Sequence, residues 1–108
     1  MSRSYEMAIE ISGITKEKRK RVKEAVESEW NVEVFDFNGK DAFASGYGSL
    51  CGGESEEEFS QRVARAIWQA NGGYCEVTVK ATYLDGLPYE TYFFGPGEYK
   101  RMRRMKHV

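Results

Sequence analysis

Hydrophobic and polar residues alternate most clearly over residues 74–84, where apolar side chains occupy every second position. An alternation of period two is typical of a β-strand with one buried and one solvated face. Asp85 and Gly86 follow and favour a tight turn, because both residue types tolerate positive φ. β-branched and aromatic residues at 91–94 predict a returning strand, and Pro88, which has no backbone N–H to donate, favours a sheet edge for it. We therefore predict a β-hairpin here.

Residues 5–11 alternate in the same way and predict a first strand. A helix is expected over residues 16–29, with Thr15 as its N-cap. A second helix is expected after Ser55, since Ser55 and Glu58 have the spacing of a capping box. Its apolar stripe consists of Phe59, Val63, Ala66, Ile67 and Ala70. The run Asn71, Gly72 and Gly73 is expected to end it, because these residues accept the left-handed conformation.

The segment 31–47 predicts a second hairpin, because Asn38 and Gly39 form the strongest turn signal of the chain. A two-residue turn at these positions would pair Phe37 with Lys40. Both faces of this hairpin are apolar: one carries Val32, Val34 and Phe43, and the other carries Phe35, Phe37 and Ala42. Only one face can cover the core, and the pattern leaves both assignments open.

The predicted elements follow the order strand, helix, strand, strand, helix, strand, strand. The first six, over about residues 5–84, resemble the split βαβ arrangement of the ferredoxin-like superfold. The resemblance implies an α+β fold of two layers, with both helices on one face of an antiparallel sheet of strand order 4-1-3-2. The last strand is expected to extend this order to 5-4-1-3-2. We predict one domain over residues 1–97 and a basic tail over 98–108, which is either a short helix or frayed.

The chain has 108 residues, 31% charged and 41% hydrophobic, a composition typical of one globular domain. No apolar run approaches the roughly 20 residues that span a bilayer, and the first residues lack the apolar core of a signal peptide. We therefore expect a cytoplasmic protein without membrane association, in which Cys51 and Cys75 are free thiols. Two cysteines and one histidine without metal-binding spacing predict no metal site, and no cofactor is expected.

The net charge of −1 is unevenly distributed, because residues 96–108 carry five basic residues against one acidic residue. A second basic stretch lies in the first predicted helix. The candidate nucleic-acid-binding residues are Lys16, Arg19, Lys20, Lys23, Lys100, Arg101, Arg103 and Arg104. Interleaved glutamates and the acidic body argue against such binding. RNA binding on the sheet face is also disfavoured, because Glu6 and Glu10 take the expected open-face positions of the first strand.

The glycine-rich stretch between Gly46 and Gly53 precedes a helix, a place where backbone amides attract anions. That helix opens with several glutamates, which would repel a phosphate, and no lysine stands in the P-loop position. We therefore interpret the stretch as a flexible connection.

The sequence offers no catalytic triad, because its only histidine is His107, near the terminus. Cys51 lies near a helix start, but the neighbouring carboxylates oppose a lowered thiol pKa. A cofactor-free enzyme or small-ligand binder would have to use tyrosines lining a cavity between the sheet and the helices. The tyrosines considered for this role are Tyr47, Tyr83 and Tyr92.

The leading interpretation is a small, non-catalytic interaction protein. In the predicted sheet, the centre of the open face is polar, and aromatic rings lie toward its margins. Phe35 and Phe37 lie on the strand at the more open edge, so we predict that they contact a protein partner or a second copy. The alternative is a monomer in which Met102 and Met105 of the tail cover these rings.

Overall fold

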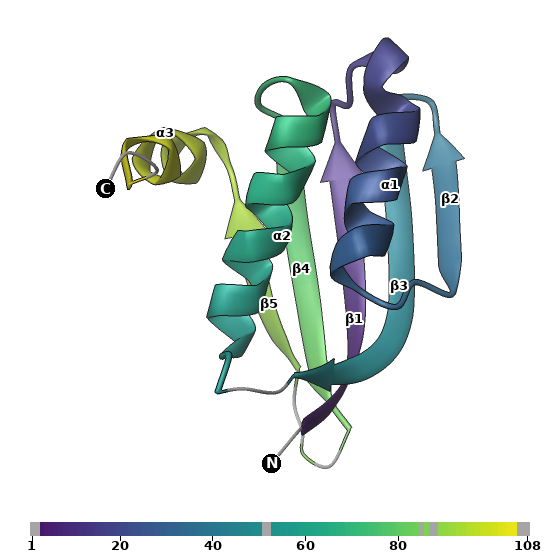
Figure 1. The fold of residues 1–108 in the computed structure, drawn as a ribbon, viewed down its shortest axis with the longest axis vertical. Coiled ribbons are helices and arrows are strands. Elements are labelled where there is room, and N and C mark those ends of the chain that lie inside the picture. The colour runs from purple at the N-terminus through teal and green to yellow at the C-terminus, as the bar shows by residue number, and fades with distance from the viewer. Residues whose placement is uncertain (1–2, 51–52, 85, 87–88, 106–108) are drawn as a thin grey trace.

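The computed structural model describes residues 3–50, 53–84, 86 and 89–105, with no side chain described for residues 3 and 103–105. Its elements are β1 (Arg3–Ser12), a 3₁₀ turn η1 (Lys16–Lys18), α1 (Arg19–Glu29), β2 (Val34–Asn38), β3 (Asp41–Leu50), α2 (Glu56–Asn71), β4 (Glu76–Tyr83), β5 (Glu90–Phe94) and α3 (Pro96–Met105). Helices α1 and α2 lie side by side on one face of the sheet (Figure 1). The prediction of an α+β fold is confirmed.

The sheet has five antiparallel strands in the order β2-β3-β1-β4-β5. β1 is central, and its side chains at 5, 7, 9 and 11 are buried under the helices, as the alternation predicts. The corresponding residues of β4, Val77, Val79 and Ala81, are also buried. These side chains form the sheet side of one hydrophobic core, and the inner faces of α1 and α2 form its helix side.

The helix-facing positions of β3 from 42 to 48 carry only small residues, and the buried Leu50 ends the series. Ala42 and Ala44 are buried, and Gly46 and Gly48 continue the same alternation. A Cβ atom on Gly46 would lie 2.0 Å from the backbone oxygen of Asn31, and one on Gly48 would lie 2.9 Å from the ring of Trp30. The glycines therefore let the segment after α1 pack directly onto the strand.

This packing corrects the prediction of a flexible connection that begins at Gly46. The strand β3 continues through Leu50, and Trp30 Nε1 donates a buried hydrogen bond of 2.8 Å to the carbonyl of Gly46. Gly46 and Gly48 serve close packing and not flexibility. Gly53, which has a φ of +81°, is the one described glycine of the stretch in the left-handed region.

The predicted turn of the second hairpin is displaced by one residue. The two turn residues are Gly39 and Lys40, so Phe37 pairs with Ala42 and not with Lys40. The φ of +65° at Gly39 fits the first turn position of a type II′ turn. The displacement moves each partner by two residues. The predicted division between the two faces therefore survives for the residues within β2 and β3. Val32 is the exception, because it precedes β2 and packs against the core instead of lying with Val34 and Phe43.

The predicted N-cap at Thr15 is wrong. Its side chain makes no capping hydrogen bond, and a 3₁₀ turn precedes α1. The backbone N–H of Thr15 instead donates 2.8 Å to Oδ1 of the buried Asn71, at the end of α2. Asn71 therefore ties the start of one helical segment to the end of the other.

Helix α2 begins as predicted. The hydroxyl of Ser55 accepts from the N–H of Glu58, and the carboxylate of Glu58 accepts from the N–H of Ser55, which completes the capping box. The helix ends at Gly72 with a φ of +76°. Of the predicted apolar stripe, Phe59, Val63 and Ile67 are buried, and the buried surface also includes Ala64 and Trp68. Trp68 is covered from the side of α3, where it lies in T-shaped contact with Tyr99 at 4.9 Å.

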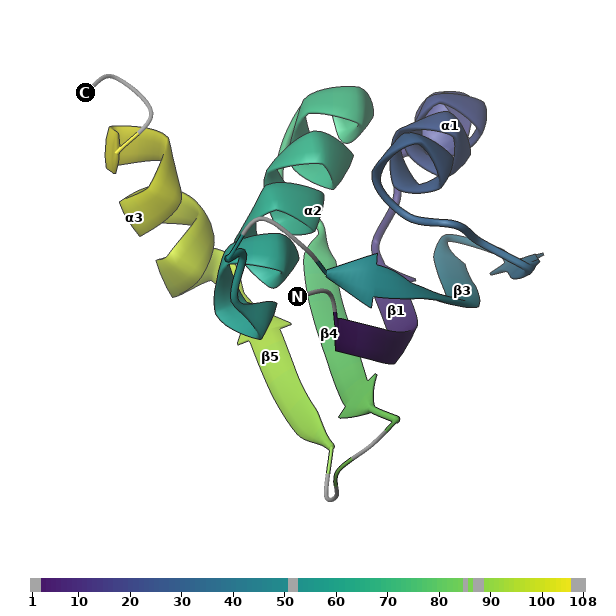
Figure 2. The same ribbon diagram turned by 60° about the horizontal axis from the view of Figure 1, so that its bottom comes forward.

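Helix α3 lies beside α2, on the side away from α1 (Figures 1 and 2). Its Met102 is buried, and its Tyr99 contacts the rings of Trp68 and Tyr74. The alternative in which Met102 covers the rings of β2 is therefore wrong, because β2 is the opposite edge strand. The side chain of Met105 lies outside the described residues. The division into a domain over 1–97 and a tail over 98–108 stays a prediction.

Candidate functional site

The face of the sheet opposite α1 and α2 is not covered by any described helix, and we call it the open face (Figure 2). Its centre is polar, because Glu6, Ala8 and Glu10 of β1 alternate with the buried side chains. The neighbouring residues on β4 are Thr78, Lys80 and Thr82, which pair with them across the strands. This part of the open face agrees with the sequence prediction.

Aromatic and aliphatic side chains flank this polar centre on both sides. Seven large hydrophobic side chains are exposed among the described residues, and five of them lie on the strands or strand ends of the open face. These five are Val34, Phe43, Tyr47, Tyr89 and Phe93. Tyr47 and Phe93 are each at least half exposed, at 50% and 53%. So large a share on one face marks it as the candidate functional surface.

One end of the open face is acidic. Strand register places Phe43 in a row between Asp36 and Glu10. The next row contains Asp41 and Glu76, on either side of Ser12. These residues line a shallow hollow of about 410 Å³. Among the described residues no basic side chain lines this hollow or forms an ion pair with its carboxylates.

Phe35 and Phe37 do not belong to the open face, which corrects the placement predicted from the sequence. They pair with Ala44 and Ala42 and point to the helix side of the sheet. Phe35 is half-buried, and the charged group of Lys23 lies 6.0 Å from its ring. The guanidinium of Arg19 lies 5.5 Å from the Phe37 ring. A partner contact through Phe35 and Phe37 stays a prediction, but it would use the rim of the helix layer.

The sequence contained a signal that decides this assignment. Small residues at every second position of β3 mark the side against which a helix packs closely. The residues between them, Phe43 and Tyr47, must then point to the other face. The large side chains of this hairpin alone leave the assignment open, and the small ones decide it.

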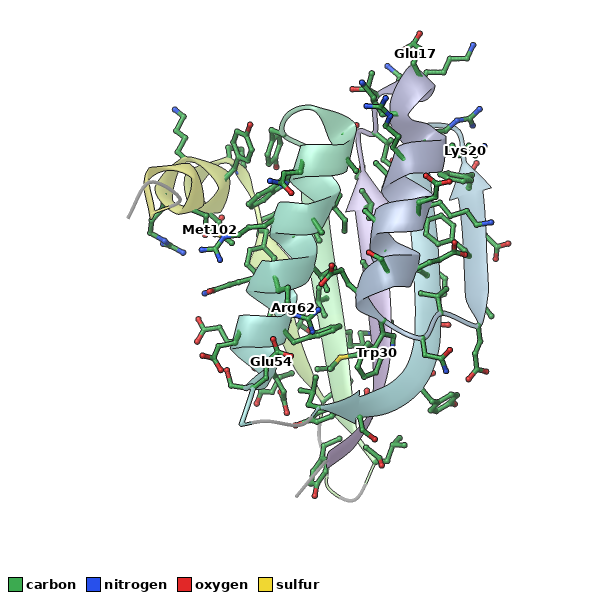
Figure 3. The ribbon with its side chains drawn as sticks, in the orientation of Figure 1. Glu17, Lys20, Trp30, Glu54, Arg62 and Met102 are labelled. Carbon is green, nitrogen blue, oxygen red and sulfur yellow. The ribbon has the colours of Figure 1, made fainter. Side chains whose placement is uncertain are left out.

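The two basic stretches do not form one continuous strip. Lys16 lies on η1, and the rest of the first stretch, Lys20 included, lies on α1. Lys100 and Arg101 lie on α3, and α2 lies between α1 and α3 (Figures 1 and 3). Arg19 and Lys23 are turned toward the phenylalanines of β2. The side chains of Arg103 and Arg104 lie outside the described residues. Nucleic-acid binding through these residues stays a prediction.

A second hollow, of about 670 Å³, lies between α2 and α3, and Arg62, Trp68 and Met102 are among its lining residues. Arg62 forms ion pairs with Glu54, at 2.9 Å, and with Glu29 (Figure 3). The hydrogen bond that Arg62 donates to the carboxylate of Glu54 is the main cause that raises the pKa of Arg62. A guanidinium that is charged at every relevant pH links α1 to the start of α2, which is a structural role.

The three tyrosines considered for a ligand cavity occupy different places. Tyr47 is exposed on the open face, and the ring of Tyr83 packs against that of Tyr5 at 5.3 Å. The hydroxyl of Tyr92 donates 3.2 Å to Glu56, which also accepts a bond of 2.6 Å from Tyr5. Burial and the Glu56 carboxylate raise the pKa of Tyr92 to about 12. This arrangement holds the start of α2 onto the sheet.

The thiol of Cys75 is buried, and burial raises its pKa to about 12. At neutral pH it is a protonated, inaccessible thiol, and the prediction that Cys75 forms no disulfide is confirmed. Cys51, Asp85, Pro88 and His107 lie outside the described residues. Within residues 3–50, 53–84, 86 and 89–105, no group of three or more histidine, cysteine, aspartate or glutamate side chains is arranged to hold a metal ion.

The sequence matches no protein-family model and no curated protein. In the described part of the chain, no helix has both the length and the apolar character needed to cross a membrane.

Proposed function

We propose that this chain is a small, non-catalytic interaction protein that binds a protein partner through the open face of its sheet. The observation that carries the proposal is the concentration of exposed large hydrophobic side chains on that face. Rings such as those of Phe43 and Phe93 expose apolar surface to water. Binding of a partner that covers them would be stabilised by the removal of this apolar surface from water. The polar centre between the rings would give such a contact direction and specificity.

We also propose a ferredoxin-like arrangement for the fold and a cytoplasmic location for the protein. The strand order β2-β3-β1-β4-β5, with both main helices on one face, supports a ferredoxin-like arrangement with one added strand. This superfold hosts many unrelated functions, so the open face and not the fold carries the functional proposal. A cytoplasmic location is supported by the free, buried thiol of Cys75.

Photocrosslinking tests this proposal with a matched pair of positions. Phe43 and Phe37 are exposed to similar extents, 39% and 37%, but lie on opposite faces of the same hairpin. Each is replaced separately by the photoreactive analogue benzoylphenylalanine, and the purified, tagged protein is irradiated in a lysate of the cells that produce it. We expect protein adducts from position 43 and none from position 37.

Three other outcomes would overturn the proposal. Adducts from position 37 alone would move the contact to Phe35 and Phe37. Adducts that a nuclease removes would indicate nucleic acid as the partner. The absence of adducts at both positions, in a protein that retains its fold by circular dichroism, would mean that the open face binds nothing in that lysate.

A further inference from the structure

We infer that the partner of the open face is a second copy of this chain, which docks its basic helix α3 against the acidic end of that face. This inference rests on the proposed function, because it names the occupant of the same surface. The chain itself carries both halves of a complementary pair of surfaces, one acidic and one basic, on different sides of the molecule.

The acidic half combines carboxylates with an exposed ring. Side chains directly opposite each other on neighbouring strands lie about 4.5–5.5 Å apart at Cβ. The register therefore brings Asp36 and Glu10 to either side of Phe43, and Asp41 and Glu76 into the adjacent row. A guanidinium or ammonium group placed here could contact carboxylates at its edge and the ring of Phe43 at its face.

The same carboxylates oppose a symmetric contact between two open faces. A two-fold face-to-face dimer would place the acidic rows of both copies in one interface, since the same patch is used on both sides. Like charges placed opposite one another without a counter-ion disfavour such packing. The apolar rings alone would permit this dimer, but the charges favour a basic occupant.

The basic half is α3. Tyr99 and Met102 hold this helix on α2, while Lys100 and Arg101 are exposed. The only acidic residue of the helix is Glu98, whose carboxylate accepts the N–H of Gly95 at 2.9 Å. α3 therefore presents positive charge from a fixed position, and the sequence adds two further arginines to the same helix.

The basic residues of α1 are less suited to this contact. Lys23 is in contact range of Glu27 at 3.8 Å, and Arg19 lies over the ring of Phe37. Glu17 and Glu24 dilute the remaining charge. α1 therefore provides a matched control, because Lys20 is as exposed a cation as Lys100 but lies outside the proposed interface.

The two surfaces differ, so the contact is heterologous. One copy uses its open face and the next uses its α3, and each still has an unused surface of the other kind. Association is therefore expected to continue beyond a dimer, or to close into a ring, with rising concentration. It is also expected to weaken with salt, because the charges at the interface rim are screened over about 10 Å at 0.1 M ionic strength.

Sedimentation velocity of the full chain, at low and moderate salt and up to millimolar concentration, tests the inference. One variant reverses the acidic surface, Glu10→Lys with Glu76→Lys, and another reverses the basic surface, Lys100→Glu with Arg101→Glu. Each alone would place like charges in the contact, and we expect its self-association to weaken roughly tenfold or more. The control, Lys20→Glu, should associate like the wild type.

Mixing the two reversed variants gives the decisive measurement. Each supplies the surface that the other lost, so association should return in the equimolar mixture. This restoration also shows that both variants are folded. A wild type that stays monomeric at low salt, a mixture that stays monomeric, or a control as weak as the Lys100 variant would each overturn the inference.

Failure of this inference is distinguishable from failure of the proposed function. If crosslinking at Phe43 yields adducts with the mass of a different protein and none with twice the chain mass of 12.4 kDa, the open face is a binding surface but α3 is not its occupant. If position 43 yields no adduct of either kind, both proposals fail.

Discussion

Replacing Gly46 by alanine is expected to destabilise the fold severely. The new Cβ atom would lie 2.0 Å from the Asn31 oxygen and 3.0 Å from Cα of Val32, so backbone and not a flexible side chain would have to move. Overpacking of this kind costs about 1–3 kcal/mol and sometimes more. Displacement of the Asn31 segment would also strain the buried bond from Trp30 to the Gly46 carbonyl, worth about 1–3 kcal/mol if its groups are left unpaired.

The combined loss of about 4 kcal/mol is a large part of the roughly 5–15 kcal/mol that stabilises a typical domain. Urea denaturation followed by tryptophan fluorescence measures it, because Trp30 donates its indole hydrogen bond to the carbonyl of Gly46. The control is Gly73→Ala, where an added Cβ meets no atom within 4 Å. If Gly46→Ala unfolds within about 1 kcal/mol of this control, close packing does not explain the glycines of β3.

Two further predictions concern the start of α2. Ser55→Ala removes the acceptor for the Glu58 N–H and should lower the free energy of unfolding by about 1 kcal/mol; an unchanged urea midpoint would contradict the capping role. Tyr92 has a pKa raised from 10.0 to about 12, so its neutral form stabilises the fold below pH 10 and this contribution is lost as pH rises toward 12. Tyr92→Phe should therefore show a shallower fall of stability between pH 10 and 12 in urea titrations, and an identical slope in both proteins would refute the assignment.

The elements were predicted correctly where a local pattern of residues is typical of one structure alone. The alternation in β1 and β4 identifies the buried face, and the spacing of Ser55 and Glu58 identifies the start of α2. These signals are local, because they depend on periodicity and on backbone groups within one turn. They can therefore be interpreted without knowledge of the tertiary contacts.

The errors arose where a distant contact decides the local structure. Thr15 has the chemistry of an N-cap, but Asn71 supplies the acceptor for its N–H from the far end of α2. Gly46 resembles a loop residue, but it lies in a strand because the chain after α1 packs against it. Phe35 and Phe37 were expected on the open face but point to the helix side, for the same reason. The small residues of β3 allow α1 and the segment after it to pack on one face of the hairpin, and this packing decides to which side Phe35 and Phe37 point.

The central position of β1 also has a consequence for synthesis of the chain. β1 is synthesised before the other described elements, but its two edges are closed by β3 and β4, and β4 ends only at Tyr83. A nascent chain that has reached α2 can pair β1 with β3 and cover part of it with α1, while the other edge of β1 stays open. A chain stalled before residue 76 would therefore expose an unpaired, apolar strand edge, and such an intermediate is prone to pair with other chains until β4 emerges.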